Sequence, residues 1–288
     1  MSDYLTTKEV ADLLRLRERK IYDLAARGEI PCMKATGKLL FPRDELTRWM
    51  SARGGSSSST GHLPEVVLGS HDPVLEWAIG ASQCGLPVLL GGSLDGLARF
   101  ERNEGAICGV HIPNQLNEDW NLEVVTDRFA DRRVVLMHWS RRERGLIVRP
   151  TVELAHFSQL MQTRFVKRQA DSGAQHILEK QLATAGLTMD SVNCVREART
   201  ETEAALALVE GQADVTFGLR CFADRYGLKF VPVCTESFDL LIDRHAYCEP
   251  AFQTLLAFTR TEIFATEVAR YEGYDVSALG VIRLNGSV

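Results

Sequence analysis

Hydrophobic residues follow two different patterns along the chain, and the change falls near residue 63. Beyond that point, short apolar runs typical of strands alternate with longer segments whose apolar residues have helical spacing. Helices are expected over residues 74–81, 94–102, 173–185 and 204–210. Strands are expected over residues 65–69, 87–91, 106–111, 133–139, 145–149, 164–167, 213–218, 230–233 and 238–243. This alternation predicts an α/β domain with a parallel sheet over residues 64–288, here called the body.

Residues 1–52, here called the head, instead predict two short helices and a hairpin. Thr6 and Glu9 have the spacing of a capping box, in which side chains satisfy free backbone amides at a helix start. A second short helix is expected over residues 17–26. Residues 30–41 read as a two-stranded hairpin with a basic tip, and a closing helix begins after it. This combination predicts a winged helix-turn-helix.

A winged helix-turn-helix places the start of its second helix in the major groove of DNA, where side chains meet base edges. Lysines on the wing contact backbone phosphates. The candidate DNA-binding residues are Arg17, Arg19, Lys20 and Tyr22 on the second helix, and Lys34 and Lys38 on the wing. The same charges also fit the solvated surface of a small helical domain, so the pattern alone leaves both interpretations open.

The head carries a series of motifs that match a known family. They are Tyr4-Leu-Thr-Thr-Lys-Glu-Val-Ala-Asp-Leu-Leu, Lys20-Ile-Tyr, Gly28-Glu-Ile-Pro, Gly37-Lys and Phe41-Pro-Arg-Asp-Glu-Leu. In order and spacing they resemble the excisionase-type, MerR-related DNA-binding module. The resemblance implies DNA binding through residues 17–22 and the wing. One departure is the Arg-Leu-Arg-Glu-Arg turn at residues 15–19, where the family more often has small or hydroxylated residues.

Charge is divided unevenly between head and body. The chain has 33 basic and 38 acidic residues, a net charge of −5. The head carries ten basic and eight acidic residues, a net of +2, which leaves −7 for the remainder. A mildly basic head on an acidic body fits a DNA reader joined to a domain that binds something else. Residues 53–63, rich in glycine and serine, are expected to form a flexible linker with an r.m.s. span of about 18 Å.

Cysteine usage and the apolar runs indicate the compartment. Seven cysteines are scattered without a C-x-x-C pair, which favours reduced thiols and argues against a zinc site. The N-terminal residues lack a basic and then apolar secretory signal, and no apolar run approaches the ~20 residues needed to span a bilayer. We therefore expect a cytoplasmic protein with no metal, no cofactor and no membrane partner.

Three predicted strand-to-helix turns of the body carry small polar residues where a helix begins. They are Gly69-Ser-His-Asp-Pro, Gly91-Gly-Ser-Leu-Asp-Gly and Arg168-Gln-Ala-Asp-Ser-Gly. Free amides at a helix N-terminus, together with a serine hydroxyl, form a natural anion site. Because such turns meet at the carboxyl ends of strands, we expect them to line one pocket. The alternative for any single turn is that serine and aspartate merely cap their own helices.

Longer segments of the body match a second family. They are Gly69-Ser-His-Asp-Pro, Gly92-Ser-Leu-Asp-Gly-Leu, Ala106-Ile-Cys-Gly-Val-His-Ile, Arg144-Gly-Leu-Ile-Val, Arg164-Phe-Val-Lys-Arg-Gln-Ala-Asp-Ser-Gly, Ala213-Asp-Val-Thr-Phe-Gly-Leu-Arg and Glu236-Ser-Phe-Asp-Leu. They resemble the periplasmic-binding-protein-like domains fused to helix-turn-helix regulators, and through them the molybdate-binding proteins. The resemblance implies a type II fold of two lobes around a cleft, with chain crossings near 143–145 and 234–237. Lobe I would take about 64–143 and 237–288, and lobe II about 144–236.

The resemblance also implies that three serines and an arginine of the turns face the ligand: Ser70, Ser93, Ser172 and Arg168. With their neighbours, the candidate ligand-binding residues are Ser70, His71, Ser93, Arg168, Gln169, Ser172 and Gly173. Hydroxyls, amides and a guanidinium suit an oxyanion such as molybdate or tungstate. Asp72, Asp95 and Asp171 would repel a dianion, so they are expected to turn back as helix caps. A small organic anion, or a molecule like the molybdenum cofactor, suits the same cleft.

No motif favours an enzyme. Asp95 occupies the position where a G-x-S-x-G nucleophile motif needs its last glycine. His111 and His138 lie near strand ends, where a buried, hydrogen-bonded histidine is the expected state. The chain is therefore predicted to be a one-component transcription regulator that acts as a homodimer or higher homo-oligomer on paired half-sites of double-stranded DNA. The alternative from another class is a cytoplasmic small-molecule-binding protein or enzyme with no regulatory role.

Overall fold

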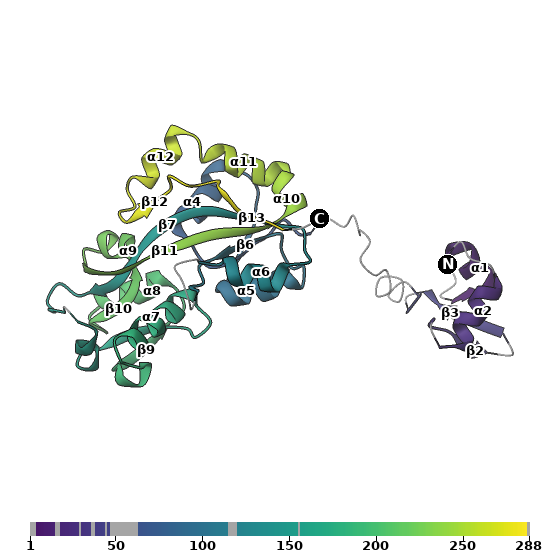
Figure 1. Cartoon of the computed structure of the whole chain (residues 1–288), viewed down its shortest axis with the longest axis horizontal. Coiled ribbons are helices and arrows are strands. Elements are labelled where there is room, and N and C mark those ends of the chain that lie inside the picture. The colour runs from purple at the N-terminus through teal and green to yellow at the C-terminus, as the bar shows by residue number, and fades with distance from the viewer. Residues whose placement is uncertain are drawn as a thin grey trace. The chain divides into compact units, whose positions relative to one another are not determined.

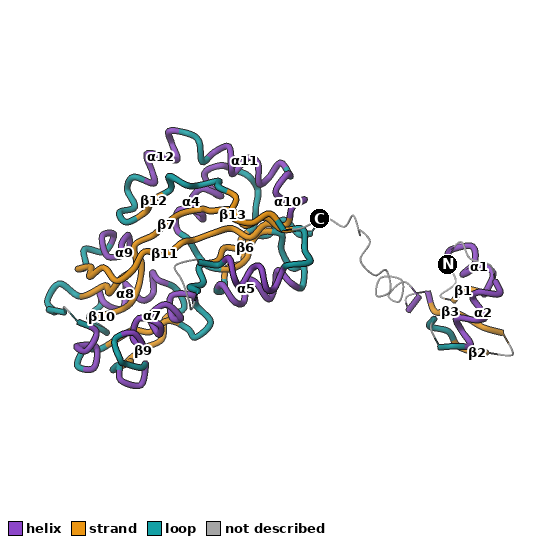
Figure 2. The backbone as a smooth tube through the Cα atoms, in the orientation of Figure 1, coloured by secondary structure: helices purple, strands orange, loops and turns teal. Residues whose placement is uncertain are grey.

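The computed structural model describes residues 4–14, 18–28, 30–35, 38–43, 45–46, 63–114, 120–154 and 156–286. The chain divides into two compact units, Met1–Gly61 and His62–Val288. Figures 1 and 2 show that each unit has its own sheet and helices. Within the described ranges, no helix is long and apolar enough to cross a membrane. The predicted linker lies outside these ranges except for Leu63.

Residues 43, 45 and 46 of the head are helical, within the predicted closing helix, and the rest of that helix lies outside the described residues. The head also has three strands and two complete helices among its described residues. They are β1 (Tyr4–Thr6), α1 (Thr7–Leu14), α2 (Glu18–Ala26), β2 (Met33–Ala35) and β3 (Lys38–Pro42). The β2–β3 hairpin confirms the predicted wing, and β1 adds a third, antiparallel strand to it. The capping box is confirmed, because the Glu9 carboxylate accepts hydrogen bonds from the Thr6 amide at 2.7 Å and the Thr6 hydroxyl at 2.8 Å. Val10, Ile21 and Phe41 are buried in the small core.

The body is built on one mixed sheet. Among the described residues it has ten strands, in the order β5-β4-β6-β11-β7-β10-β8-β9, with β12 and β13 paired to β7. The strands are β4 (Val67–Gly69), β5 (Val88–Leu90), β6 (Ile107–Val110), β7 (Val134–Val148), β8 (Phe165–Arg168), β9 (Cys194–Ala198), β10 (Val215–Leu219), β11 (Lys229–Asp243), β12 (Tyr274–Asp275) and β13 (Ile282–Asn285). The α-helices are α4 (Pro73–Ser82), α5 (Ser93–Glu101), α6 (Leu122–Phe129), α7 (Gly173–Thr184), α8 (Glu201–Val209), α9 (Arg220–Arg225), α10 (Arg244–Cys248), α11 (Pro250–Phe258) and α12 (Glu262–Val268). Two short 3-10 turns, η1 (Phe157–Met161) and η2 (Met189–Ser191), complete it.

The prediction of a parallel sheet is wrong for the middle of this sheet. β5, β4 and β6 are parallel, and so are β10, β8 and β9. Between these halves, β7 and β11 pair antiparallel with each other and with β6 and β10. Each is one strand of 15 residues, where the apolar pattern predicted two short strands. The two long strands therefore cross from one parallel half to the other, as Figure 1 shows.

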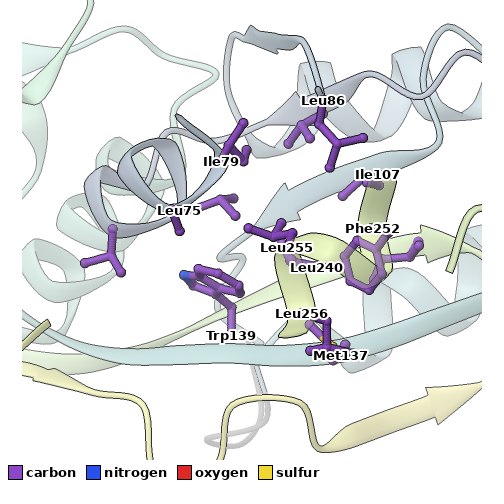
Figure 3. Close-up of a cluster of buried hydrophobic side chains, with 14 of the residues drawn as sticks. Leu75, Ile79, Leu86, Ile107, Met137, Trp139, Leu240, Phe252, Leu255 and Leu256 are labelled. Atoms are coloured by element: carbon purple, nitrogen blue, oxygen red, sulfur yellow. The ribbon is translucent and has the colours of Figure 1, made fainter. Parts of the chain in front are cut away.

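Helices cover both faces of each half of the sheet. In the first half, α4, α11 and α12 pack on one face, where Leu75, Trp139 and Leu255 belong to a single buried cluster (Figure 3). On the opposite face, α5 and α6 meet through Phe100 and Phe129, whose ring centroids are 5.4 Å apart. In the second half, α8 and α9 cover one face and α7 covers the other. Burial on both faces explains why β4, β6 and β10 read as largely apolar runs.

Candidate functional site

The first two predicted turns follow the carboxyl ends of β4 and β5 and contact each other there. The hydroxyl oxygens of Ser70 and Ser93 lie 2.8 Å apart, and both side chains are buried. Ser93 also accepts a hydrogen bond from the backbone amide of His111, at 3.1 Å, directly after β6. The ends of three neighbouring strands therefore converge on the Ser93 hydroxyl.

The third turn, from the other half of the sheet, touches this junction. A Cβ on Gly92 would lie 2.7 Å from the carbonyl oxygen of Asp171, and a Cβ on Gly173 would lie 2.6 Å from the ring of His111. Only glycine permits backbone and ring to approach this closely. The structure thus brings all three turns together. They are called the turn junction below.

The aspartates of the turns do not all behave alike. Asp72 caps α4, as expected, because its Oδ1 accepts a hydrogen bond from the Leu75 amide at 2.7 Å. Asp95 instead accepts a hydrogen bond from Arg99, one turn further along α5, at 2.8 Å. Asp171 is exposed and lies before the residue that caps α7. The expectation of three capping aspartates is therefore right for Asp72 and wrong for the other two.

The helix starts differ in a way that matters for anions. Ser172 caps α7 by accepting a hydrogen bond from the Gln175 amide at 3.2 Å. α5 begins after Gly92 with no side-chain cap. The first backbone amides of a helix have no hydrogen-bond partner within the helix. At α4 and α7 a capping side chain accepts from one of these amides, whereas no side chain caps α5. The first amides of α5 therefore remain available to a ligand.

Two further predicted ligand residues make local contacts. His71 Nε2 and the Glu76 carboxylate, on the exposed side of α4, are 2.8 Å apart. Gln169 reaches the second turn and donates from its side-chain amide to the Gly91 carbonyl oxygen at 3.2 Å. Gln169 therefore lies at the turn junction, whereas the imidazole of His71 is engaged with its own helix.

Arg168 faces the neighbouring strand β9 rather than the serine pair. Its guanidinium donates to the carbonyl oxygens of Ala198 at 3.2 Å and Arg199 at 2.7 Å. It also lies 3.8 Å from the carboxylate of Glu201. Burial lowers the pKa of Arg168, and Glu201 partly offsets this effect. The arginine joins a buried set of charges that the sequence pattern did not reveal.

Glu236, on β11, is central to these buried charges. Its carboxylate accepts hydrogen bonds from Arg142 and, at 2.7 and 3.0 Å, from Arg144, both on β7. His111 Nδ1 lies 3.1 Å from the same carboxylate. Arg142 also donates to Asp72 at 2.8 Å. The contacts join the crossing strands to the first turn and to the end of β6.

The buried charged residues around Glu236 continue into the second half of the body, and their charges balance. Arg144 lies 2.8 Å from the carboxylate of Glu201, which Arg168 also approaches. Three arginines thus face three acids, Asp72, Glu201 and Glu236. We call these six residues the crossing network. Because its formal charges cancel, the network does not itself require a bound anion.

Burial and neighbouring charge set the protonation states in the crossing network. Burial alone would raise the pKa of Glu236, but the guanidiniums of Arg142 and Arg144 hold it well below its usual value. Burial lowers the pKa of the adjacent His111, and Glu236 offsets only part of that effect. At neutral pH the carboxylate is therefore charged and the imidazole is neutral. The expectation of a buried, hydrogen-bonded histidine holds for His111, and also for His138, which lies 2.8 Å from Asp239.

A cavity of about 400 Å³ adjoins the turn junction. Among the described residues it is lined by Leu94, Ile112, Pro113, His176 and Lys180. Leu94 directly follows Ser93, Ile112 directly follows His111, and His176 lies in the first turn of α7. The cavity is therefore bordered by both halves of the body.

In the head, the described candidates for DNA contact are exposed. Arg19, Lys20 and Tyr22 lie on α2, and Tyr22 has 52% of its surface accessible. Lys34 lies on β2 and Lys38 on β3. Arg17 falls outside the described residues. Exposure on the second helix and the wing is compatible with binding to the groove and the phosphates of DNA, and their role there stays a prediction.

Comparison with known families identifies both units. Residues 78–260, more than half of the chain, match the family described as PBP superfamily domain. The chain belongs to the PBP superfamily. Residues 4–54 match a second family, described as helix-turn-helix domain. This PBP-superfamily chain therefore joins a helix-turn-helix head to a periplasmic-binding-protein-like body, which is the make-up of a DNA-binding regulator with a ligand-binding domain.

Proteins similar to this PBP-superfamily chain have low sequence identity to it. It is 21% identical to the uncharacterized protein YvgK of Bacillus subtilis (strain 168), across 97% of both chains. Its structure is similar to that of a Clostridium perfringens protein named as a phosphate ABC transporter substrate-binding protein, solved with bound phosphate, with a TM-score of 0.54, 13% identity and coverage of 75% of this chain and 99% of that one. It is also similar to an OxyR variant of Corynebacterium glutamicum solved with hydrogen peroxide bound, with a TM-score of 0.51, 10% identity and coverage of 98% and 94%. At these identities the structural likeness shows the fold.

Proposed function

We propose that the protein is a one-component transcription regulator whose head binds double-stranded DNA and whose body binds a small anion. The observation that carries the proposal is the turn junction, where buried serines and the uncapped start of α5 lie beside a cavity that Lys180 lines. A protein of the same fold has been solved with bound phosphate, so the fold accommodates a small anion. Action on DNA would place the regulator in the cytoplasm.

Hydrogen-bond donors remain for an anion at the turn junction. The hydroxyls of Ser70 and Ser93 bond to each other, and only one of their two hydrogens is used in that bond. The other hydrogen can point to a ligand. The first amides of α5 add donors whose dipoles favour negative charge. Molybdate and tungstate are inorganic candidates for such a site, and small carboxylates are organic ones.

The position of the turn junction suggests how binding reaches the head. An anion that contacts α5 from the first half and α7 from the second would favour the arrangement in which the halves are closed. It can shift this equilibrium only if it binds the two states unequally. We infer that closure changes how two heads of a homodimer are presented to paired half-sites, where two weak contacts reinforce each other.

The proposal is tested by measuring DNA binding and anion binding on the same variants of the full chain. DNA fragments enriched from the source genome supply the operator, and fluorescence anisotropy gives the affinity. Arg19→Ala and Lys20→Ala should each weaken DNA binding, and loss of a phosphate contact should reduce the salt dependence by about one ion. Thermal shifts produced by anions should stay unchanged in both variants.

Lys229→Met is the matched control, because Lys229 is exposed on β11 and pairs with Glu153. It should alter neither measurement. Failure of the whole chain to enrich any DNA sequence would contradict the regulatory role. Parallel loss of DNA binding and anion binding in Arg19→Ala would contradict the separation into two modules.

A further inference from the structure

The described lining of the cavity beside the turn junction is mainly apolar. Leu94, Ile112 and Pro113 supply hydrocarbon surface, and His176 and Lys180 come from α7. We propose that this cavity holds the apolar part of a small organic monoanion, of which a carboxylate is the simplest form. This inference rests on the proposed function and names the chemical class of its effector.

Size and polarity favour an organic ligand over a bare oxyanion. Sites for small organic molecules enclose roughly 300–1,000 Å³ and are lined mostly by apolar groups with a few polar ones. The cavity, at about 400 Å³, falls in that range. A tetrahedral oxyanion has no apolar surface to place against Leu94, Ile112 and Pro113, and removing its oxygens from water without a donor costs free energy.

The polar groups of the cavity suit a single negative charge. Lys180 Nζ donates to the carbonyl oxygen of Asn114, and an ammonium group has two further hydrogens for a carboxylate. The Nε2 atom of His176 is buried and has no hydrogen-bond partner among the described residues. Lys180 is the lining residue with a permanent positive charge in the described part of the chain. The nearby arginines are already balanced by the acids of the crossing network.

The balance of charge therefore separates monoanions from dianions. A carboxylate would form one ion pair with Lys180 and leave no excess charge among the described residues that line the cavity. Molybdate, tungstate and sulfate carry two negative charges, so one would remain without a counter-ion among the described residues that line the cavity. The apolar wall and the single ammonium thus favour the same class of ligand.

The test is a homologous series of carboxylates bound to the full chain. Acetate, butyrate, hexanoate and benzoate are titrated by calorimetry, beside molybdate, tungstate and phosphate. Each methylene that becomes buried should increase the affinity about fourfold. Hexanoate should therefore bind at least tenfold more tightly than acetate, and more tightly than any inorganic oxyanion.

Two variants test separately the lysine that would bind the carboxylate and the apolar wall that would bind the hydrocarbon chain. Lys180→Met should weaken all carboxylates about tenfold and leave the gain per methylene unchanged. Leu94→Ser should reduce the gain per methylene, and Lys229→Met should change neither quantity. The melting temperature of each variant without ligand shows whether it folds.

The outcomes separate this inference from the function on which it rests. The inference of an organic monoanion is overturned if the affinity is the same across the carboxylate series. It is also overturned if molybdate, tungstate or phosphate binds more tightly than every carboxylate. In both cases the proposal of an anion-sensing regulator still stands. Absence of binding by all of these anions overturns both.

Discussion

Replacing Glu236 with glutamine tests whether the crossing network holds the body together. The change keeps the shape of the side chain and removes its charge. Glu236 is fully buried between Arg142, Arg144 and His111. Without the carboxylate, three arginines face two acids, and the glutamine amide directs hydrogens toward a guanidinium. Breaking a buried ion pair by removing one partner costs about 3–5 kcal/mol.

The expected change is large enough to measure by calorimetry or urea unfolding of the full chain. In a unit of this size, each kcal/mol shifts the melting temperature by about 2–4 °C, so Glu236→Gln should lower it by roughly 6–20 °C. Glu197→Gln removes an exposed acid that pairs with Lys167 at 3.2 Å, and it should change stability by less than about 0.5 kcal/mol. A Glu236→Gln chain that melts within about 2 °C of the original would refute the reasoning.

A second substitution shows how much of the destabilisation by Glu236→Gln comes from the arginine that has lost its ion-pair partner. Arg142→Met should be strongly destabilising in the original chain, because Asp72 and Glu236 both lose their cation. In the Glu236→Gln background it should cost at least about 1 kcal/mol less, since the unpaired guanidinium is removed with it. Additive effects would mean that these two residues are not coupled.

Two other predictions follow from buried groups of the body. His111 is kept neutral by burial, so the stability it confers is complete above the unfolded-state pKa of about 6.5 and is lost as the pH falls from there toward its lower folded-state pKa. Urea unfolding should therefore show a loss of up to about 1.4 kcal/mol per pH unit below pH 6.5, and His111→Asn should reduce that slope; an unchanged slope would contradict the assignment. Gly96→Ala should destabilise by about 1–3 kcal/mol or more, because its Cβ would lie 2.3 Å from Gly69 Cα. Gly80→Ala, in open space on α4, should instead stabilise by about 0.5–1 kcal/mol, and equal effects of the two would refute this packing argument.

Much of the fold is predictable from local pattern, and the crossing strands show where that pattern fails. β4, β5 and β8 begin with apolar residues and lie next to helices, and each overlaps the strand that the sequence predicts there. For β7 and β11 the sequence predicts two short strands each, because polar residues interrupt their apolar runs. Arg142 and Glu236 are 94 residues apart in sequence and pair directly across the two strands. A polar residue within a strand is taken for a loop residue when its ion-pair partner lies on a strand that is distant in sequence.

Arg168 shows the same limit at the candidate site. The resemblance implies that its guanidinium meets the ligand. The expected strand, residues 164–167, stops one residue short of Arg168, which is the last residue of β8. The direction of a long side chain, however, depends on its partners, and here these are carbonyl groups at the end of β9. Four of the five residues of β9 are exposed, so this strand has no apolar signature and was not predicted. An anion that recruited Arg168 would have to compete with two carbonyl oxygens and with Glu201. Lys180, by contrast, donates to one carbonyl oxygen among the described residues and keeps hydrogens for a ligand. The positive end of the site is therefore expected on α7, a position that the spacing of motifs alone could not indicate.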